Sequence, residues 1–488
     1  MYNAVFLSVV TLIYMSPSLA NDGPFVYFDS AAYIENVAKA VAKLWPASPD
    51  LPAEAGSATT EAAFGQVQGD NIIYSGRSIY YGALVYAGWI TKIWLPVIIQ
   101  CLTMAWLTKE LTRRIFDTKW RQVTVLVAAV LTLGTSAGAF AGLLMPDIWS
   151  GLAVLALSVL WSPGHPVTRH AQIILLAILA FAALAHSSHL ALIAVLFTGC
   201  LLVRPFLAAS LRPQPATLVV PMLALLVGVA GSLAFSKVVE ATYGQPPLSR
   251  PFITAHLVDM GPGAAFAQEV CPTSDYALCA YVERLPTEWI AFLFSNSEHR
   301  GVFATADADT QRALTHEQVS FALGTMAARP LATLGGLGLD GLRQLFFLSV
   351  TDVPITHQSA GFLVDNFPPD LVAKIQGSRI YNHPAWAARF TRLIQATSLI
   401  SALILIAWVF TRARHTLGPA AYRLESMVLV CLSGLLANAL ICGILASPYG
   451  RFQARLVWLL PMLAVYILLT HSLSLAQPSP VRPVTPKK

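Results

Sequence analysis

Long apolar segments alternate with short polar ones along most of the chain. The segments read as membrane-spanning are 2–20, 80–108, 122–144, 148–162, 171–185, 189–203, 215–235, 394–411, 425–446 and 455–473. A helix needs about 20 apolar residues to cross a bilayer core, where its backbone hydrogen bonds are satisfied within the segment. The pattern therefore predicts an all-α polytopic membrane protein with about ten transmembrane helices.

Two longer stretches, 21–79 and 236–393, interrupt this pattern. We expect the first to be an exterior loop within an N-terminal transmembrane module over 1–235. The second exceeds the length a connector needs, which is typical of functional loops. We expect it to form a periplasmic loop or lid region with interfacial helices, followed by C-terminal transmembrane helices over 394–476. Residues 477–488, rich in Pro and Ser, predict a disordered cytoplasmic tail.

The second stretch contains two further features. Its segment 332–350 is fairly apolar but includes glycines, Asp340 and Arg343, which favours an interfacial or re-entrant helix over a spanning one. Cys271 and Cys279 flank a polar part of the same stretch. We expect a disulfide between them if the stretch lies outside the cytoplasm.

Composition supports a membrane location. The 488 residues are 56% hydrophobic and 11% charged, whereas about a quarter of the residues of a soluble domain are charged. The net charge of +6 does not indicate nucleic-acid binding, because the basic residues lie in short clusters between apolar segments. Soluble enzyme folds are thereby excluded, and no nucleic-acid partner is expected.

The basic clusters predict the orientation of the chain. With the N-terminus in the cytoplasm, the basic short loops all fall on that side, as the positive-inside rule requires; they include Lys109, Arg113, Arg114, Lys119, Arg121, Arg169, Arg204, Arg212, Arg412, Arg414, Arg423, Arg482, Lys487 and Lys488. We therefore expect a bacterial inner-membrane protein with both termini in the cytoplasm and both long stretches in the periplasm. The first apolar segment lacks the positive start of a signal peptide, which favours an uncleaved helix.

Two aspartates fall at the predicted outer surface. Asp29 follows the first apolar segment, where partial desolvation can raise its pKa and make it a base. Asp147 lies in the tight turn Met145-Pro146-Asp147 before the next segment. Each also fits a helix N-cap. Because they arrive from neighbouring hairpins, paired carboxylates for base catalysis or metal binding are the functional alternative.

Other polar residues gather at the same surface. The segment from Ser75 to Gly82 contains Arg77 and hydroxyl donors such as Tyr80. These groups could bind a phosphate, and anchoring at the membrane interface is the alternative. His186 and His189 occupy the outer end of a hairpin, where neither packing nor topology requires them.

Near the C-terminus, Tyr449-Gly450-Arg451-Phe452 opens the last apolar segment. Arg451 and Arg455 are one helical turn apart, so both guanidinium groups point to one place. This spacing fits a phosphate or pyrophosphate at the outer leaflet, and lipid-headgroup binding is the alternative.

These motifs resemble the GT-C superfamily of integral-membrane glycosyltransferases, which use lipid-phosphate-linked sugars as donors. The resemblance covers mostly residues 1–200 and 445–475 and rests on four short motifs: Asp29, Gly76 to Tyr80, Asp147, and Tyr449 to Phe452. The long stretch 236–393 departs from simple members, because it lies mid-chain instead of forming a C-terminal soluble domain.

The resemblance implies that Asp29 deprotonates an acceptor hydroxyl, with inversion at the anomeric carbon, and that Asp147 orients the acceptor or holds a metal. It implies that the leaving phosphate of a polyprenyl-phosphate sugar is bound by Arg77, Arg451 and Arg455, with His186 or His189 as a further donor. The implied partners are that sugar donor, membrane lipid, and an envelope glycan, lipid or protein acceptor. A divalent cation is an open option, and its site is unknown.

Other classes remain open. A polysaccharide polymerase or ligase shares the plan and the polyprenyl-linked donor. A transporter or flippase of lipid-linked glycans would place ionisable or helix-breaking residues within several spans, whereas here they lie at the outer ends. A non-enzymatic envelope assembly protein is the third alternative. The sequence has no zinc spacing, glycine-rich nucleotide loop or nucleophile elbow, so nucleotide-driven transport and serine hydrolysis lack support.

Overall fold

A computed structural model describes residues 2–44, 76–116, 118–163, 166–351, 353–411 and 419–475. The predicted tail 477–488, the part of the predicted first loop between residues 45 and 75, and the basic residues within 412–418 lie outside this description. Within it, every named element is a helix, and Phe25 and Leu143 form an isolated bridge. The all-α part of the prediction is thereby confirmed.

Six helical stretches of the described chain are long and apolar enough to cross a membrane. They lie in α1 (Tyr2–Ala20), α9 (Ser187–Val203), α10 (Pro215–Tyr243), α19 (Ala385–Phe410), α20 (Pro419–Leu445) and the consecutive pair α21 (Gly450–Val457) and α22 (Leu459–Leu475). Between them pack α3 (Ile79–Ile90), α4 (Leu95–Ile115), α5 (Trp120–Gly134), α7 (Ile148–Trp161) and α8 (Arg169–Ala185). This architecture is consistent with a polytopic membrane protein, and the number of about ten spans stays a prediction.

The segment 80–108, expected as one span, is divided into two helices. α3 ends at Ile90 and α4 begins at Leu95. Pro96 lies in the first turn of α4, where its missing N–H costs no hydrogen bond. A Cβ on Gly88 would lie 2.7 Å from Pro96 Cδ, so a glycine is needed where the two helices meet at the break.

The segment 122–144 is also divided. α5 ends at Gly134, and the short α6 (Ala137–Ala141) follows. Thr135 leaves the helix in an extended conformation, and its Oγ1 accepts a hydrogen bond from Ala137 N at 3.2 Å. The chain thereby turns before it reaches Asp147.

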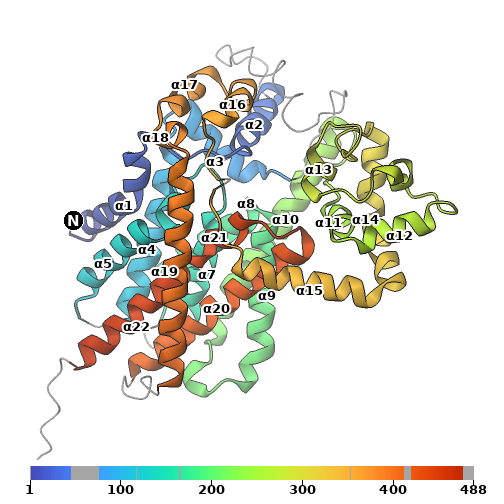
Figure 1. The fold of residues 1–488 in the computed structure, drawn as a ribbon. Helices are drawn as coiled ribbons and strands as arrows, with labels where there is room; N and C mark the ends of the chain where they lie inside the picture. Colours follow the sequence, from blue (N-terminus) through green and yellow to red (C-terminus); the bar gives the residue numbers. More distant parts are fainter. Residues whose placement is uncertain are drawn as a thin grey trace, which may run out of the picture.

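The stretch 236–393, expected as a loop region, is largely helical. α10 continues to Tyr243, beyond the predicted end at 235. Residues 248–328, which we call the insert, then form a unit beside the bundle, at the right of Figure 1. The insert contains α11 (Phe252–Met260), α12 (Pro262–Val270), α13 (Trp289–Phe294) and α14 (Ala308–Ala328) around an apolar core of its own.

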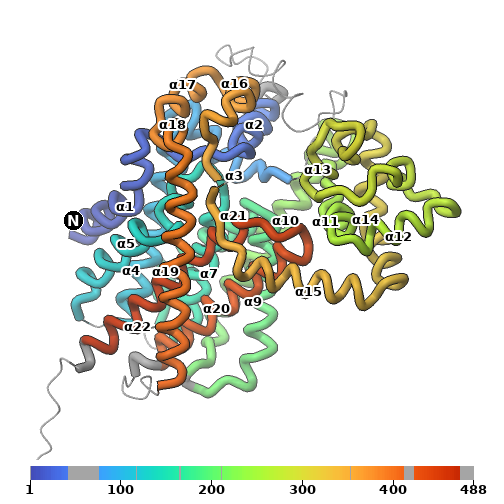
Figure 2. The backbone as a smooth tube through the Cα atoms, in the orientation of Figure 1, coloured from blue at the N-terminus to red at the C-terminus, as the bar shows by residue number. Residues whose placement is uncertain are grey.

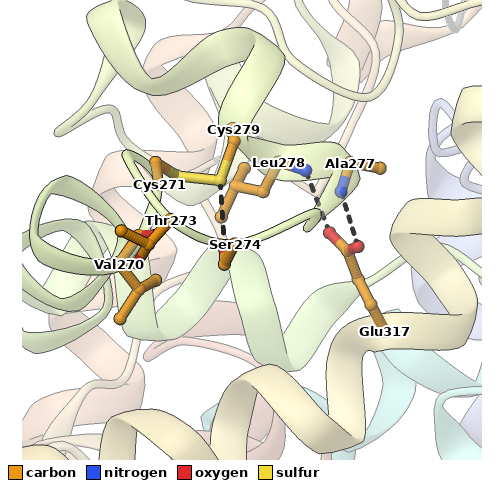
Figure 3. The surroundings of a disulfide bond; sticks show 8 residues. All are labelled: Val270, Cys271, Thr273, Ser274, Ala277, Leu278, Cys279 and Glu317. Carbon is orange, nitrogen blue, oxygen red and sulfur yellow. Dashed lines mark hydrogen bonds between the residues drawn. A yellow bond between two sulfur atoms is a disulfide. The ribbon is translucent and has the colours of Figure 1, made fainter.

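A disulfide joins Cys271 and Cys279 within the insert (Figure 3). Next to it, the Glu317 carboxylate on α14 accepts hydrogen bonds from Ala277 N at 2.8 Å and from Leu278 N at 3.0 Å. The bridge and the carboxylate together hold the segment between α12 and α13 against α14.

Helix α15 (Pro330–Phe346) leads from the insert back to the bundle, as the backbone trace in Figure 2 shows. The upper end of the same view contains α2 (Ser30–Leu44), α16 (Ala360–Asn366), α17 (Pro369–Gly377) and α18 (Arg379–Asn382). Residues 332–350 therefore form mostly helix, and their interfacial position stays a prediction.

Glycines allow α15 to pack closely on α20. A Cβ on Gly443 would lie 2.6 Å from the Asp340 carbonyl oxygen, and a Cβ on Gly341 would lie 2.9 Å from Leu440 Cδ2. Small residues at such crossings let helix backbones approach in proteins of this type. The contact attaches α15, and with it the insert, to the bundle.

We expect Gly443→Ala to destabilise the protein by about 1–3 kcal/mol, because the added methyl group forces α15 away from α20. Thermal unfolding in detergent, followed by circular dichroism, should show a lower midpoint. The matched control is Gly338→Ala on α15, where an added Cβ meets no described atom within 4 Å. This change should be neutral or stabilising by roughly 0.5–1 kcal/mol. Equal effects of the two substitutions would contradict the close-packing argument.

Candidate active site

Backbone hydrogen bonds join the two segments that carry the candidate aspartates. Phe25 N donates to Gly142 O at 2.9 Å, and Leu144 N donates to Phe25 O at 2.9 Å. Ser30 Oγ, at the start of α2, donates to Leu144 O at 2.9 Å. The segment that ends in Asp29 is therefore attached to the segment that leads to Asp147.

Asp29 forms a buried ion pair with Arg77. Arg77 Nη2 donates to Asp29 Oδ1 at 2.5 Å, and the two side chains expose 13% and 15% of their surface. Ser78 places Arg77 there: its Oγ accepts from the backbone N–H groups that open α3 and donates to Leu184 O at 2.6 Å. The backbone conformation in which Ser78 caps α3 thus also points the Arg77 guanidinium toward Asp29.

The electrostatics of Asp29 differ from the expected raised pKa. Burial raises the pKa of this carboxyl, but the guanidinium groups of Arg77 and Arg451 lower it by more, so the pKa of Asp29 lies below its usual range. Asp29 is therefore a carboxylate at neutral pH. It can accept a proton, and its neighbours decrease its affinity for one.

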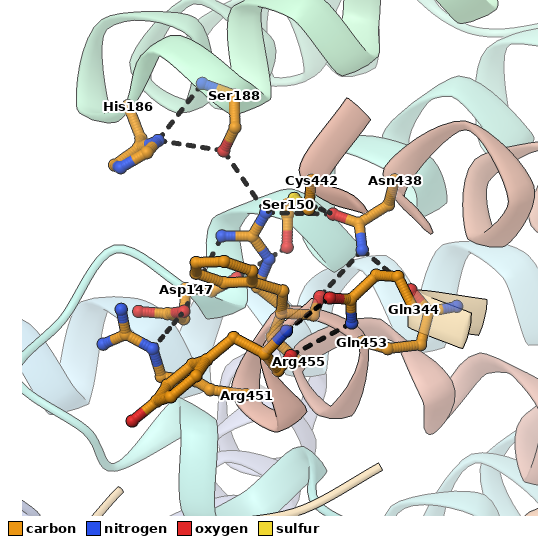
Figure 4. A network of polar contacts seen from close by, with 12 residues as sticks. Asp147, Ser150, His186, Ser188, Gln344, Asn438, Cys442, Arg451, Gln453 and Arg455 are labelled. Atoms are coloured by element: carbon orange, nitrogen blue, oxygen red, sulfur yellow. Dashed lines mark hydrogen bonds and ion pairs between the residues drawn. The ribbon is translucent and has the colours of Figure 1, made fainter. Parts of the chain in front are cut away.

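Asp147 lies between two arginines (Figure 4). Its Oδ1 is 3.8 Å from Arg451 Nε and 3.7 Å from Arg455 Nη1. Asp147 occupies the N-cap position of α7 but makes no capping hydrogen bond with its side chain. The observed role of this carboxylate is thus to hold the two guanidinium groups of α21.

Three further groups hold Arg455. Its Nη2 donates to Asn438 Oδ1 at 2.9 Å, to Ser188 Oγ at 3.2 Å and to Cys442 Sγ at 3.4 Å. Asn438 in turn donates to Gln453 Oε1 at 2.8 Å. The sequence did not single out Asn438, because a single amide within the long apolar segment of α20 gives no signal.

The Tyr27 ring covers Arg451, and a glutamine fixes the neighbouring Tyr449. Its guanidinium carbon lies 4.0 Å from the centre of the Tyr27 ring, within range of a cation–π interaction. Tyr449 is fixed by Gln344 of α15, which accepts from Tyr449 N at 2.7 Å and donates to Tyr449 O at 3.0 Å. Tyr27 and Gln344 were not predicted, although Tyr27 stands only two residues before Asp29.

The two histidines lie at the edge of this cluster. His186 Nδ1 accepts from Ser188 N at 3.1 Å and lies 2.9 Å from Ser188 Oγ, which also bonds Arg455. Burial, and next the Arg455 guanidinium, lowers the pKa of His186 to about 4, so the ring is neutral. His189 is fully buried, with its ring centre 5.3 Å from that of His186.

Tyr80 does not join the charged cluster through its hydroxyl group. That group donates to Gly231 O at 2.8 Å and ties α3 to α10. The disulfide-bonded Cys271 and Cys279 lie in the insert, where they hold its fold. In the described part of the chain, no group of three or more His, Cys, Asp or Glu side chains is placed to hold a metal ion.

The cluster retains unused hydrogen-bond donors. Arg77, Arg451 and Arg455 face two carboxylates, Asp29 and Asp147, so positive charge is in excess. Nε and Nη1 of Arg451 and Nε of Arg455 are buried without a hydrogen-bond partner among the described residues. Buried donors are normally satisfied, and guanidinium groups bind phosphate through paired N–H bonds. The arrangement therefore suits an anion such as a phosphate group.

Comparisons with family models and with the sequences of curated proteins find no match. Among solved structures, the crystal structure of ArnT from Cupriavidus metallidurans bound to undecaprenyl phosphate is similar to this chain. The sequence identity is 11% and the TM-score 0.34, over 90% of this chain and 77% of ArnT. Similarity at this level assigns no activity, so the functional argument rests on the residues of this chain.

Proposed function

We propose that this protein is a membrane glycosyltransferase that moves a sugar from a lipid-phosphate donor to an acceptor hydroxyl on the periplasmic face. The acceptor would be an envelope glycan, lipid or protein. The charged cluster around Asp147 is the active site in this proposal. A polymerase or ligase that uses the same kind of donor performs the same bond chemistry.

One observation carries the proposal: two arginines of α21 lie within 4 Å of one carboxylate and keep unused buried donors. A glycosyl phosphate develops negative charge on its phosphate as the glycosidic bond breaks. Buried donors that are already held in place stabilise that charge without reorganising, which lowers the barrier. Arg451 and Arg455 therefore bind the leaving phosphate, and Asp147 keeps them aligned.

Asp29 is the proposed base. The acceptor hydroxyl oxygen attacks the anomeric carbon of the donor from the face opposite the phosphate, the bond from that carbon to the phosphate oxygen breaks, and the hydroxyl proton passes to the Asp29 carboxylate. The products are an inverted glycoside and a polyprenyl phosphate. Arg77 maintains Asp29 in its ionised form before the reaction, because their ion pair favours the carboxylate.

We expect Asp29→Asn to decrease sugar transfer about 100- to 10,000-fold, the usual range for removing a general base. The assay is transfer of a radiolabelled sugar from a polyprenyl-phosphate donor in proteoliposomes. Donor affinity should change little, which also shows that the variant is folded.

The matched control is Asp22→Asn, in the same segment between α1 and α2. Asp22 is 60% exposed and pairs with Arg379 at 3.1 Å, away from the arginine cluster. The Asp22→Asn variant should transfer sugar at the same rate as the unchanged protein. Full activity of Asp29→Asn would remove Asp29 as the base, and movement of the lipid-linked sugar across the bilayer without bond cleavage would indicate a transporter.

We expect Arg451→Gln to weaken donor binding about 10- to 150-fold, because a charge-assisted hydrogen bond contributes about 1.5–3 kcal/mol. Equilibrium binding of the polyprenyl-phosphate sugar in detergent measures this change. Arg379→Gln, an exposed arginine paired with Asp22, should leave the affinity unchanged. Equal affinities for both variants would remove the phosphate role from Arg451.

The proposed orientation can be tested at the two ends of α10. Gln214 precedes this helix and Gln245 follows it, and both are exposed. In a variant with Cys200→Ser, a cysteine at Gln245 should react with a membrane-impermeant maleimide in intact cells. A cysteine at Gln214, near the basic Arg204 and Arg212, should react only after permeabilisation. The reverse pattern would place the active site on the cytoplasmic face.

A further inference from the structure

A second candidate site lies between the insert and α15. A cavity of about 940 Å³ is lined by His256, Asp259 and Met260 of α11, by residues of α15 and the following Phe347, and by Ser447 and Pro448. Cavities of this size hold organic ligands. Pro448 directly precedes Tyr449, and Arg451 follows three residues later, so the cavity adjoins the arginine cluster without containing its residues.

The ionisable groups of this cavity are arranged differently from those of the arginine cluster. Asp340 is bound by His256 Nε2 at 3.1 Å and by Arg343 Nη1 at 3.0 Å, while His256 Nδ1 lies 3.1 Å from the Ile444 carbonyl oxygen. Asp259 is a further carboxylate at the rim. The cavity thus contains two carboxylates and one guanidinium group besides the His256 ring, so there is no excess of positive charge to attract a phosphate.

Most of the cavity wall is apolar and continues onto an exposed surface. Leu339, Leu342 and Phe346 line the cavity, and Leu342 and Phe346 expose 54% and 77% of their surface. Leu331 extends the same face toward the start of α15. A contiguous apolar face of this kind marks contact with lipid or another apolar partner. The cavity therefore opens where a lipid chain can lie against α15.

We propose that this cavity binds the acceptor, and that the acceptor is a membrane amphiphile with a hydroxylated head group. Hydroxyl groups both donate to a carboxylate such as Asp259 and accept from a guanidinium such as Arg343, which suits the balanced charges here. The apolar chain follows Leu342 and Phe346. This inference rests on the proposed glycosyl transfer, and it specifies the chemical class of the acceptor.

The connection between the two sites is short and rigid. Gln344 is fully buried on the face of α15 that points to the bundle, and it bonds both backbone groups of Tyr449. Tyr449 thus stands between the cavity and Arg451. Because Pro448 and Arg451 are three residues apart, their Cα atoms are separated by at most about 11 Å. A head group bound beside Pro448 therefore lies near the proposed phosphate-binding arginines, as transfer between the two ligands requires.

The test uses the full-length protein in phosphatidylcholine nanodiscs and dodecyl glucoside with a photoreactive diazirine in its chain. We expect cross-links to peptides of α11 and α15, competed by unlabelled dodecyl glucoside. Leu342→Trp should decrease this labelling about tenfold or more, because the larger side chain obstructs the proposed path of the alkyl chain along the cavity wall. The matched control is Leu334→Trp, on the same helix and equally exposed at 56% but outside the cavity lining. The probe should cross-link to the Leu334→Trp variant to the same extent as to the unchanged protein.

Equal labelling of the two tryptophan variants overturns the site, and equal labelling by a dodecyl phosphate probe overturns the choice of head group. Donor binding separates this inference from the proposed function. If the polyprenyl-phosphate sugar binds and is turned over but Leu342→Trp transfers sugar as Leu334→Trp does, the acceptor cavity is wrong and the transferase stands. If labelling behaves as expected but no sugar donor is bound or cleaved, the amphiphile site stands and the transferase is wrong.

Discussion

Asp147 holds two buried guanidinium groups, and the arrangement of the site follows from this interaction. Arg451 and Arg455 leave water when α21 packs beside α7, and buried cations are costly unless a negative charge and hydrogen-bond acceptors surround them. One carboxylate cannot neutralise both, so Asn438 and Ser188 supply further acceptors to Arg455, and the Tyr27 ring covers Arg451. Residues from both ends of the chain are thereby required in one place.

The remaining positive charge gives the cluster a chemical preference. A protein could satisfy the unused donors of Arg451 and Arg455 with another carboxylate, yet Asp29 is paired with Arg77 instead. An anionic ligand would complete the hydrogen bonds of the arginines. The proposal of a phosphate-bearing donor rests on this excess of buried donors, because a neutral sugar brings no charge to balance it.

The cavity beside α15 has no comparable excess of positive charge. Asp340 pairs with His256 and Arg343, and the cavity walls are mostly apolar. The arginine cluster has excess positive charge and the cavity has none. This difference matches the proposed ligands, which are an anionic lipid-phosphate donor and a hydroxylated acceptor. The close packing of α15 on α20 at Gly341 and Gly443 attaches one wall of this cavity to the bundle, which connects the stability of the insert's attachment to the proposed chemistry.

The sequence alone determined the helical, membrane-type architecture, because the need for about 20 apolar residues per span is visible locally. It also indicated Arg451 and Arg455, whose spacing of one helical turn aligns them wherever the helix lies. Only the tertiary structure decided that Asp29 pairs with Arg77 and has a lowered pKa, and that Asp147 holds the arginines instead of capping α7. These outcomes depend on which charges meet in a buried space. The sequence did not predict three further residues of the cluster, Tyr27, Asn438 and Gln344. Their partners lie far away in the chain, so no local pattern marks them.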